Sequence, residues 1–264
     1  MTDTNGRVRS MSRSDPIRTR YYSAVELADK VSDWLFYANA ALSIASLLVE
    51  RQAHPIAYDW ILICFAVAVV ALFTIGLVSR LYLTPRAEDK RRQDFFTSAC
   101  GVGLTHEKTD GYYNNDFTEP IKRMAAQVLE NSHFSKTIAL SMARTERIKV
   151  IAYAIVWLIC VLNRQTDLGI VVAASQAVFS EQVVSKWLRL EWLRIRFEKT
   201  YDDVYRLFQS KPAAPKFNAM TLESLGMYET AKANAAITLS SKVFHRLNAE
   251  LSVEWERIKA ELKI

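Results

Sequence analysis

The most constraining feature of the sequence is one long apolar run, residues 58–83 (YDWILICFAVAVVALFTIGLVSRLYL). Between Trp60 and Val78 the run contains no charged residue. As a helix it is long enough to cross a hydrocarbon core of ~30 Å. Helices buried in soluble domains rarely stay apolar on every face over such a length. The run therefore predicts a membrane-spanning helix.

Three weaker apolar blocks predict further spans, at residues 31–49, 148–163 and 168–179. The first is rich in Ala and Ser, which allow close helix packing in membranes. The other two are short, and they fit either a crossing hairpin or a shallow re-entrant pair; extension and tilting of the flanking helices favour the crossing hairpin. The four blocks predict an all-α fold, a four-helix transmembrane bundle made of two hairpins.

Charged segments between these blocks divide the chain into five expected regions. They are a disordered basic tail (1–20), a first transmembrane hairpin with a preceding amphipathic helix (21–83), a cytoplasmic helical insert (84–147), a second transmembrane hairpin (148–186) and cytoplasmic C-terminal helices (187–264). Within the insert, Asn131-Ser132 is expected to interrupt a helix. From Met227 one last helix is expected to run to residue 264.

The charge distribution predicts the orientation in the membrane. The formal net charge is +6, and Lys and Arg cluster beside the apolar blocks, as the positive-inside rule expects. With four spans, only two short turns, carrying Arg51 and Arg164, lie opposite the rest of the polar chain. The sequence thus predicts a multi-pass protein of the inner (plasma) membrane with both termini cytoplasmic. Orientation in a lipid bilayer explains most of the excess of Lys and Arg. We therefore expect no DNA or RNA duplex as a partner.

The sequence offers little for catalysis. An enzyme needs a nucleophile with its base, paired carboxylates or a cluster of metal ligands. His106-Glu107 lacks the second His that a zinc protease helix requires. Cys64, Cys100 and Cys160 have no disulfide or metal-site spacing. We therefore expect no enzyme activity, no cofactor and no metal site.

The most unusual local string is DGYYNND, residues 110–116. Gly, Asn and Asp suit a tight turn because they tolerate left-handed backbone geometry. Tyr112 and Tyr113, beside Asn114 and Asn115, also suit stacking on and hydrogen bonding to a base or another planar ligand. A structural turn and a ligand contact both fit the string.

Two further groups of residues allow a structural and a functional interpretation. Arg144 and Arg147 precede the third apolar block, where they serve either as positive-inside anchors or as a basic collar that binds phosphate or gates a pore. Gln176 and Glu181, in and after the fourth block, are the residues we expect to line a pore, although such polar groups also link helices by hydrogen bonds. Any conduction path is expected within residues 148–186, which are more polar than the run at 58–83.

The last segment carries apolar residues at alternating intervals of three and four. Such a heptad-like seam packs either against the cytoplasmic insert or against another subunit. The seam consists of Phe244, Leu247, Leu251, Trp255, Ile258 and Leu262.

The layout resembles the four-transmembrane effectors of bacterial antiphage signalling, which are associated with cyclic-oligonucleotide synthases and predicted to form pores. The likeness covers roughly residues 21–209. The local strings that carry it are GYYNND (111–116), ENSHFSK (130–136), MARTERIK (142–149) and KWLRLEWLRIRF (186–197).

This resemblance implies an inner-membrane effector of antiphage defence. Its cytoplasmic part would respond to a cyclic nucleotide or oligonucleotide from a neighbouring synthase, and its membrane part would form a homo-oligomeric pore. Lys122, Arg123, Arg144 and Arg147 would supply charge for phosphates, and the tyrosines and asparagines of 112–115 would contact the bases. The alternative is a non-conducting membrane anchor that holds a cytoplasmic interaction module.

Overall fold

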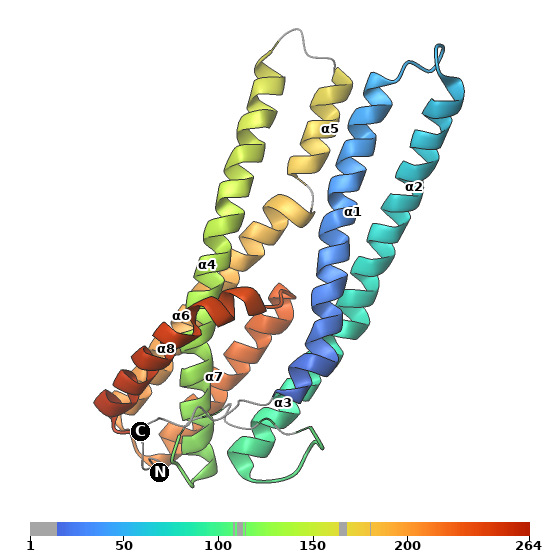
Figure 1. Cartoon of the computed structure of the whole chain (residues 1–264). Helices are drawn as coiled ribbons and strands as arrows, with labels where there is room; N and C mark the ends of the chain where they lie inside the picture. The colour runs from blue at the N-terminus through green and yellow to red at the C-terminus, as the bar shows by residue number, and fades with distance from the viewer. Residues whose placement is uncertain (1–14, 108, 110–112, 114, 164–167, 180) are drawn as a thin grey trace, which may run out of the picture.

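The computed structural model describes residues 15–107, 109, 113, 115–163, 168–179 and 181–264. Every regular element in these ranges is helical, and none is a strand. The molecule is elongated, with long helices side by side at one end and a compact group of helices at the other (Figure 1). The expected all-α class is confirmed.

The elements follow one another with few breaks, so that several form longer helical segments. In chain order they are η1 (Arg18–Tyr22), α1 (Ser23–Leu48), α2 (Pro55–Val78), η2 (Ser79–Leu83), α3 (Thr84–Cys100), α4 (Pro120–Leu162), α5 (Leu168–Val178), η3 (Glu181–Ser185), α6 (Lys186–Ser210), α7 (Ala214–Ala235) and α8 (Ser241–Leu262), where η denotes a single π-helical turn. Helical structure begins before residue 21, inside the tail expected to be disordered.

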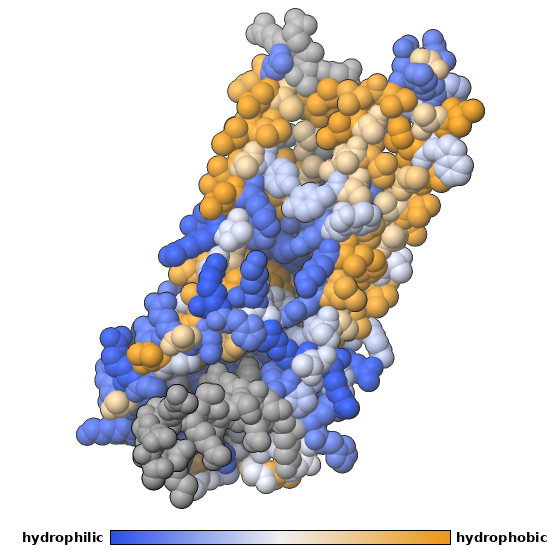
Figure 2. Space-filling view, viewed as in Figure 1, coloured by the Kyte–Doolittle hydropathy of each residue, from blue (hydrophilic) through white to orange (hydrophobic). Residues whose placement is uncertain are grey.

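Three helical segments are long and apolar enough to cross a membrane: Arg18–Leu48, Pro55–Cys100 and Leu168–Ser210. No residue of α2 is buried within the chain. Figure 2 shows apolar side chains covering the end of the molecule formed by the long helices. So large an apolar surface is rare on a soluble monomer but suits contact with lipid. The finding is consistent with the expected membrane protein.

The third expected span is part of a much longer helix, α4. It runs unbroken past Asn131-Ser132, so the expected interruption there is wrong. The Ser132 hydroxyl donates to the Leu129 carbonyl (3.0 Å) inside the helix. Because this hydroxyl is bonded within the helix, Ser132 does not end it. The apolar part of α4 covers only residues 150–162 and directly follows Lys149. Among the described helices, length and composition therefore support three candidate spans rather than four.

The compact end, which we call the helical body, consists of α3, the first part of α4, α6, α7 and α8 (Figure 1). Leu129, Val204 and Trp255 are almost fully buried and belong to one core cluster. Leu193 and Phe197 pack with Tyr228 in a second cluster. Burying a large apolar side chain contributes about 1.5–3 kcal/mol, so these clusters hold the body together.

The C-terminal region has two helices instead of the single helix expected from Met227. Ala236 ends α7 with a left-handed φ of 47°. Ser240 then caps α8, its hydroxyl accepting a hydrogen bond from the Val243 amide (3.4 Å).

The apolar seam of α8 packs within the same chain. Trp255, Ile258 and Leu262 of the seam share a core cluster with residues of the expected cytoplasmic insert, among them Phe95 and Met124, which confirms the packing against the insert. The buried members of the seam are Leu251, Trp255, Ile258 and Leu262.

Candidate functional site

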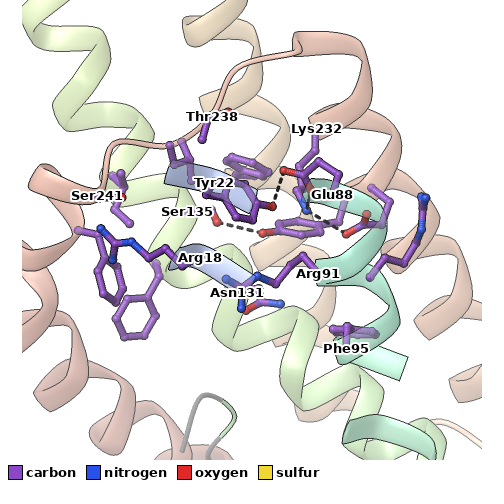
Figure 3. A pocket seen from close by; sticks show the side chains of 18 of the residues that line it. Arg18, Tyr22, Glu88, Arg91, Phe95, Asn131, Ser135, Lys232, Thr238 and Ser241 are labelled. Carbon is purple, nitrogen blue, oxygen red and sulfur yellow. Dashed lines mark hydrogen bonds and ion pairs between the residues drawn. The ribbon is translucent and has the colours of Figure 1, made fainter. Parts of the chain in front are cut away.

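A cavity of about 200 Å³ lies where the first helical segment and α3 meet the rest of the helical body. We call it the junction cavity; Figure 3 shows the side chains that point into it. Arg18, Tyr22 and Glu26 enter from the first segment, and Glu88 and Arg91 enter from α3. The rest of the lining comes from Asp15 before η1, Tyr113 between α3 and α4, the helices α4, α6, α7 and α8, and the turn between α7 and α8.

A polar network centred on Glu88 crosses this junction. The Tyr22 hydroxyl donates to Glu88 Oε1 (2.8 Å), and Lys232 Nζ lies 2.5 Å from Glu88 Oε2. Burial by itself lowers the pKa of Lys232, but the nearby Glu88 carboxylate and then Glu229 outweigh it and hold that pKa well above its usual value. The ammonium is therefore charged at neutral pH, and it ties α7 to α3.

Two arginines extend the network along the cavity wall. Arg91 Nη2 lies 2.6 Å from Asp15 Oδ2, and the guanidinium of Arg91 lies 5.6 Å from the centre of the Tyr22 ring. Arg18 Nη1 is 3.0 Å from His245 Nε2 of α8. These contacts bring the start of the first helical segment against both α3 and α8.

Aromatic side chains form another part of the lining. Tyr228 stacks at a tilt on Phe197, with ring centres 5.1 Å apart, and its hydroxyl lies 3.0 Å from Ser135 Oγ. Phe134 and Phe244 pair at 6.2 Å and also line the cavity. The cavity thus combines flat aromatic faces with paired charges, and Lys232 Nζ lies 5.5 Å from the centre of the Tyr228 ring.

The size and chemistry of the junction cavity limit what it can hold. Its volume is below the ~300–1,000 Å³ typical of sites for drug-sized ligands. Guanidinium groups suit phosphate or carboxylate, and tyrosine rings suit a planar group. A small planar compound with an anionic group fits these features, provided that it displaces some of the existing ion pairs. Across the described residues, no three His, Cys, Asp or Glu side chains are placed to share a metal ion.

The predicted tyrosine–asparagine string lies partly outside the described residues, which exclude Tyr112 and Asn114. Tyr113 lines the junction cavity, and its ring meets that of Phe95 edge-on at 5.9 Å. Asn115 is partly buried. Of this string, the structure therefore places Tyr113 at the cavity, while it also packs against the core as the structural interpretation expects.

The four predicted phosphate-binding cations are not brought together. Lys122 and Arg123 lie in the first turn of α4, and Lys122 pairs with Glu119 (2.7 Å). Arg144 is 22 positions after Lys122 in the same helix, which places it ~33 Å further along the axis. Arg147 lies one turn beyond and pairs with Glu191 of α6. One nucleotide-sized ligand cannot contact both pairs of cations within this chain, and none of the four lines the junction cavity.

The two residues expected to line a pore lie in successive helical elements, α5 and η3. Gln176 is exposed on α5. Glu181 begins η3, and its side chain lies outside what the structure describes.

The central residues of the junction cavity were not identified from the sequence. Arg18, Tyr22 and Glu26 recur every four positions, which places them on one helix face, and this is the signal that the sequence carries. Glu88 and Lys232 lie on separate helices and meet only through the fold. Comparison with protein-family models, with curated proteins and with solved structures finds no match for this chain.

Proposed function

We propose that this protein is an inner-membrane effector of bacterial antiphage defence, which responds to a cyclic nucleotide through its helical body and permeabilises the membrane as an oligomeric pore. The observation that carries the proposal is the position of the junction cavity. Its walls belong partly to helices that continue into the candidate spans and partly to the helical body. A compound bound there contacts both.

The continuity of the helices links the junction cavity to the membrane part. Tyr22 lies in the segment Arg18–Leu48, and Glu88 lies in the segment Pro55–Cys100. Lys232 of α7 pairs with Glu88, and Glu88 also accepts a hydrogen bond from Tyr22. Through these two contacts α7 is linked to both segments. A ligand shifts such an assembly by binding more tightly to one arrangement of the walls than to another. Binding in the cavity therefore changes how the first two candidate spans sit against the body.

The proposed membrane part contains four spans, namely the three candidate segments and the short apolar end of α4. This end lies beside α5, forming a second helix pair next to the pair α1–α2 (Figure 1). In this proposal the helical body lies in the cytoplasm, which the charges flanking the four segments support through the positive-inside rule.

The ligand class comes from the resemblance to antiphage effectors, and the size of the junction cavity narrows it. At about 200 Å³ the cavity suits one nucleotide better than a cyclic oligonucleotide. In this arrangement Arg18 and Arg91 contact the phosphate, and Tyr22 or Tyr228 contacts the base.

Induced expression with a membrane-potential dye tests the proposal. Cells that express the wild-type chain are expected to depolarise, alone or together with a co-expressed nucleotide cyclase. A Val70→Lys variant places a charge in the middle of α2, which costs about 2.5–3.5 kcal/mol on insertion, and is expected not to depolarise cells. If cells with wild-type protein in the membrane stay polarised in every case, the chain is a non-conducting anchor.

A further inference from the structure

A second polar cluster lies where helices from both pairs leave their apolar stretches. Asp33 directly precedes the apolar part of α1, and Lys149 directly precedes that of α4. Lys186 follows η3 as the first residue of α6. With Glu146 these residues form what we call the boundary cluster. Figure 2 shows polar side chains reaching between apolar flanks above the helical body.

Two ion pairs organise the boundary cluster. Lys186 Nζ lies 3.4 Å from Asp33 Oδ1, which joins α6 to α1. Lys149 Nζ lies 2.9 Å from Glu146 Oε1 on α4. Asp33 is half exposed, so its pair contributes little stability and is easily opened. The contact between the two helix pairs at this level is therefore reversible.

The space enclosed by the boundary cluster is almost closed. Its cavity measures about 20 Å³, which is room for about one water molecule. Tyr37 of α1, Tyr153 of α4 and Gln182 of η3 line it together with the charged groups. The polar lining continues from one helix pair to the other, and Phe36 and Val183 complete it.

A buried amide points to water beyond this cavity. Asn39 lies six residues after Asp33 on α1, about 9 Å further into the apolar region. Only 9% of it is exposed, and neither its amide nitrogen nor its amide oxygen has a hydrogen-bond partner within the described part of the chain. Leaving such a group without a partner costs free energy, and water that reached this depth in another state of the helices would satisfy it.

The boundary cluster is connected to the junction cavity by a single helix face. Tyr22 and Asp33 are eleven residues apart in the segment Arg18–Leu48, which is close to three full turns. A rotation or shift of this segment at Tyr22 therefore also moves Asp33 relative to Lys186. This step rests on the proposed function, in which the junction cavity takes a ligand.

We propose that the boundary cluster is the closed constriction of an ion path between the two helix pairs, and that the Asp33–Lys186 pair holds it shut. Lys149, Tyr153, Gln182 and Lys186 all lie within residues 148–186, where a path was expected. Ions pass when the pair opens and water reaches Asn39.

Ion flux from lipid vesicles containing the purified full-length protein tests this proposal. Asp33→Asn and Lys186→Gln are each expected to raise the resting flux by roughly two- to fivefold, the population shift that follows loss of one half-exposed pair. The exchanged variant Asp33→Lys/Lys186→Asp restores the pair and is expected to return the flux to the wild-type level. Asp203→Asn, which removes the exposed Lys199–Asp203 pair of α6, serves as the control with wild-type flux.

The outcomes separate the constriction from the proposed function. Leaky single variants and a tight exchanged variant support the constriction. If the wild type conducts and all variants conduct equally, the constriction is wrong while the pore remains. If neither the wild type nor any variant exceeds protein-free vesicles, the proposed pore is wrong, and the constriction falls with it. Gel filtration and circular dichroism of each variant exclude misfolding as the cause of a leak.

Discussion

Lys232 Nζ lies 2.5 Å from Glu88 Oε2, and this contact joins α7 to the helix that continues from the longest apolar run of the chain. Tyr22, at the start of the first segment, donates to the other oxygen of the same carboxylate. One partly buried side chain thus receives contacts from two separate parts of the structure. The stability of the junction should depend on Glu88 and Lys232 together.

Removal of the Lys232 ammonium should destabilise the protein. In Lys232→Met the Glu88 carboxylate keeps its buried position without its cation, which should lower the free energy of unfolding by about 2 kcal/mol. Thermal unfolding in detergent measures the change. Lys199→Met, at an exposed pair on α6, is the matched control with almost no effect. Equal unfolding temperatures for the two variants would contradict the role assigned to Lys232.

The packing of α8 makes a prediction about oligomer formation. Trp255 is only 2% exposed, so Trp255→Ala should cost about 3–5 kcal/mol of unfolding free energy. Val253→Ala on the exposed face of the same helix should change it by no more than about 0.5 kcal/mol. If Trp255→Ala instead splits an oligomer and leaves unfolding unchanged, the seam serves self-association.

The buried His133 should make stability depend on pH. Burial lowers the pKa of His133, and this effect exceeds the opposing influence of Glu254, which lies 3.6 Å away on α8; Lys136 acts in the same direction as burial. The folded state therefore binds this proton less readily than the unfolded state, whose histidine titrates near ~6.5. The neutral, buried imidazole of His133 therefore contributes its full stability above the unfolded-state pKa of ~6.5. This contribution is lost as the pH falls from there toward the lower pKa of the folded state.

The measurement for His133 is the unfolding temperature between pH 7.5 and 5. For the wild type, the loss from this group should not exceed about 1.4 kcal/mol per pH unit. His133→Phe should flatten the profile in this range. An identical slope in both proteins would assign the dependence to other groups.

The turn after α3 requires a glycine at one position. Gly101 ends this helix with a φ of 69°, a conformation that costs other residues about 1 kcal/mol. Gly101→Ala should therefore lower the free energy of unfolding by that amount, as measured by chemical denaturation. Gly103→Ala, two residues later and without the positive φ, should be neutral because no atom lies near the new methyl group. A loss at Gly103 equal to that at Gly101 would show that another cause dominates.

Much of the helical layout follows directly from the sequence. The run at 58–83 specifies its own structure, because its apolar length is a local signal. The α8 seam is also local, and its periodicity predicts a buried face. Asn131-Ser132 misled the prediction, since tertiary packing on both sides of a long helix outweighs the weak helix propensity of two residues.

The candidate site is harder to predict for a physical reason. Tyr22, Glu88 and Lys232 meet only when three distant helices pack together, and no spacing in the sequence records this meeting. The sequence instead favours clusters that are local, such as the tyrosine–asparagine string and the arginines before the third apolar block. Of those, only Tyr113 among the described residues lines the junction cavity.

The central claim is that the helical body controls a conducting membrane part. Ion flux from vesicles that contain either the wild-type chain or the Lys232→Met variant tests this claim most directly. The account predicts that wild-type vesicles release a small ion faster than protein-free vesicles. It also predicts that loss of the Glu88–Lys232 contact changes this release at least about twofold, while Lys199→Met does not change it. Release equal to that of protein-free vesicles from both proteins would contradict conduction. Equal, faster release from both would contradict control through the junction.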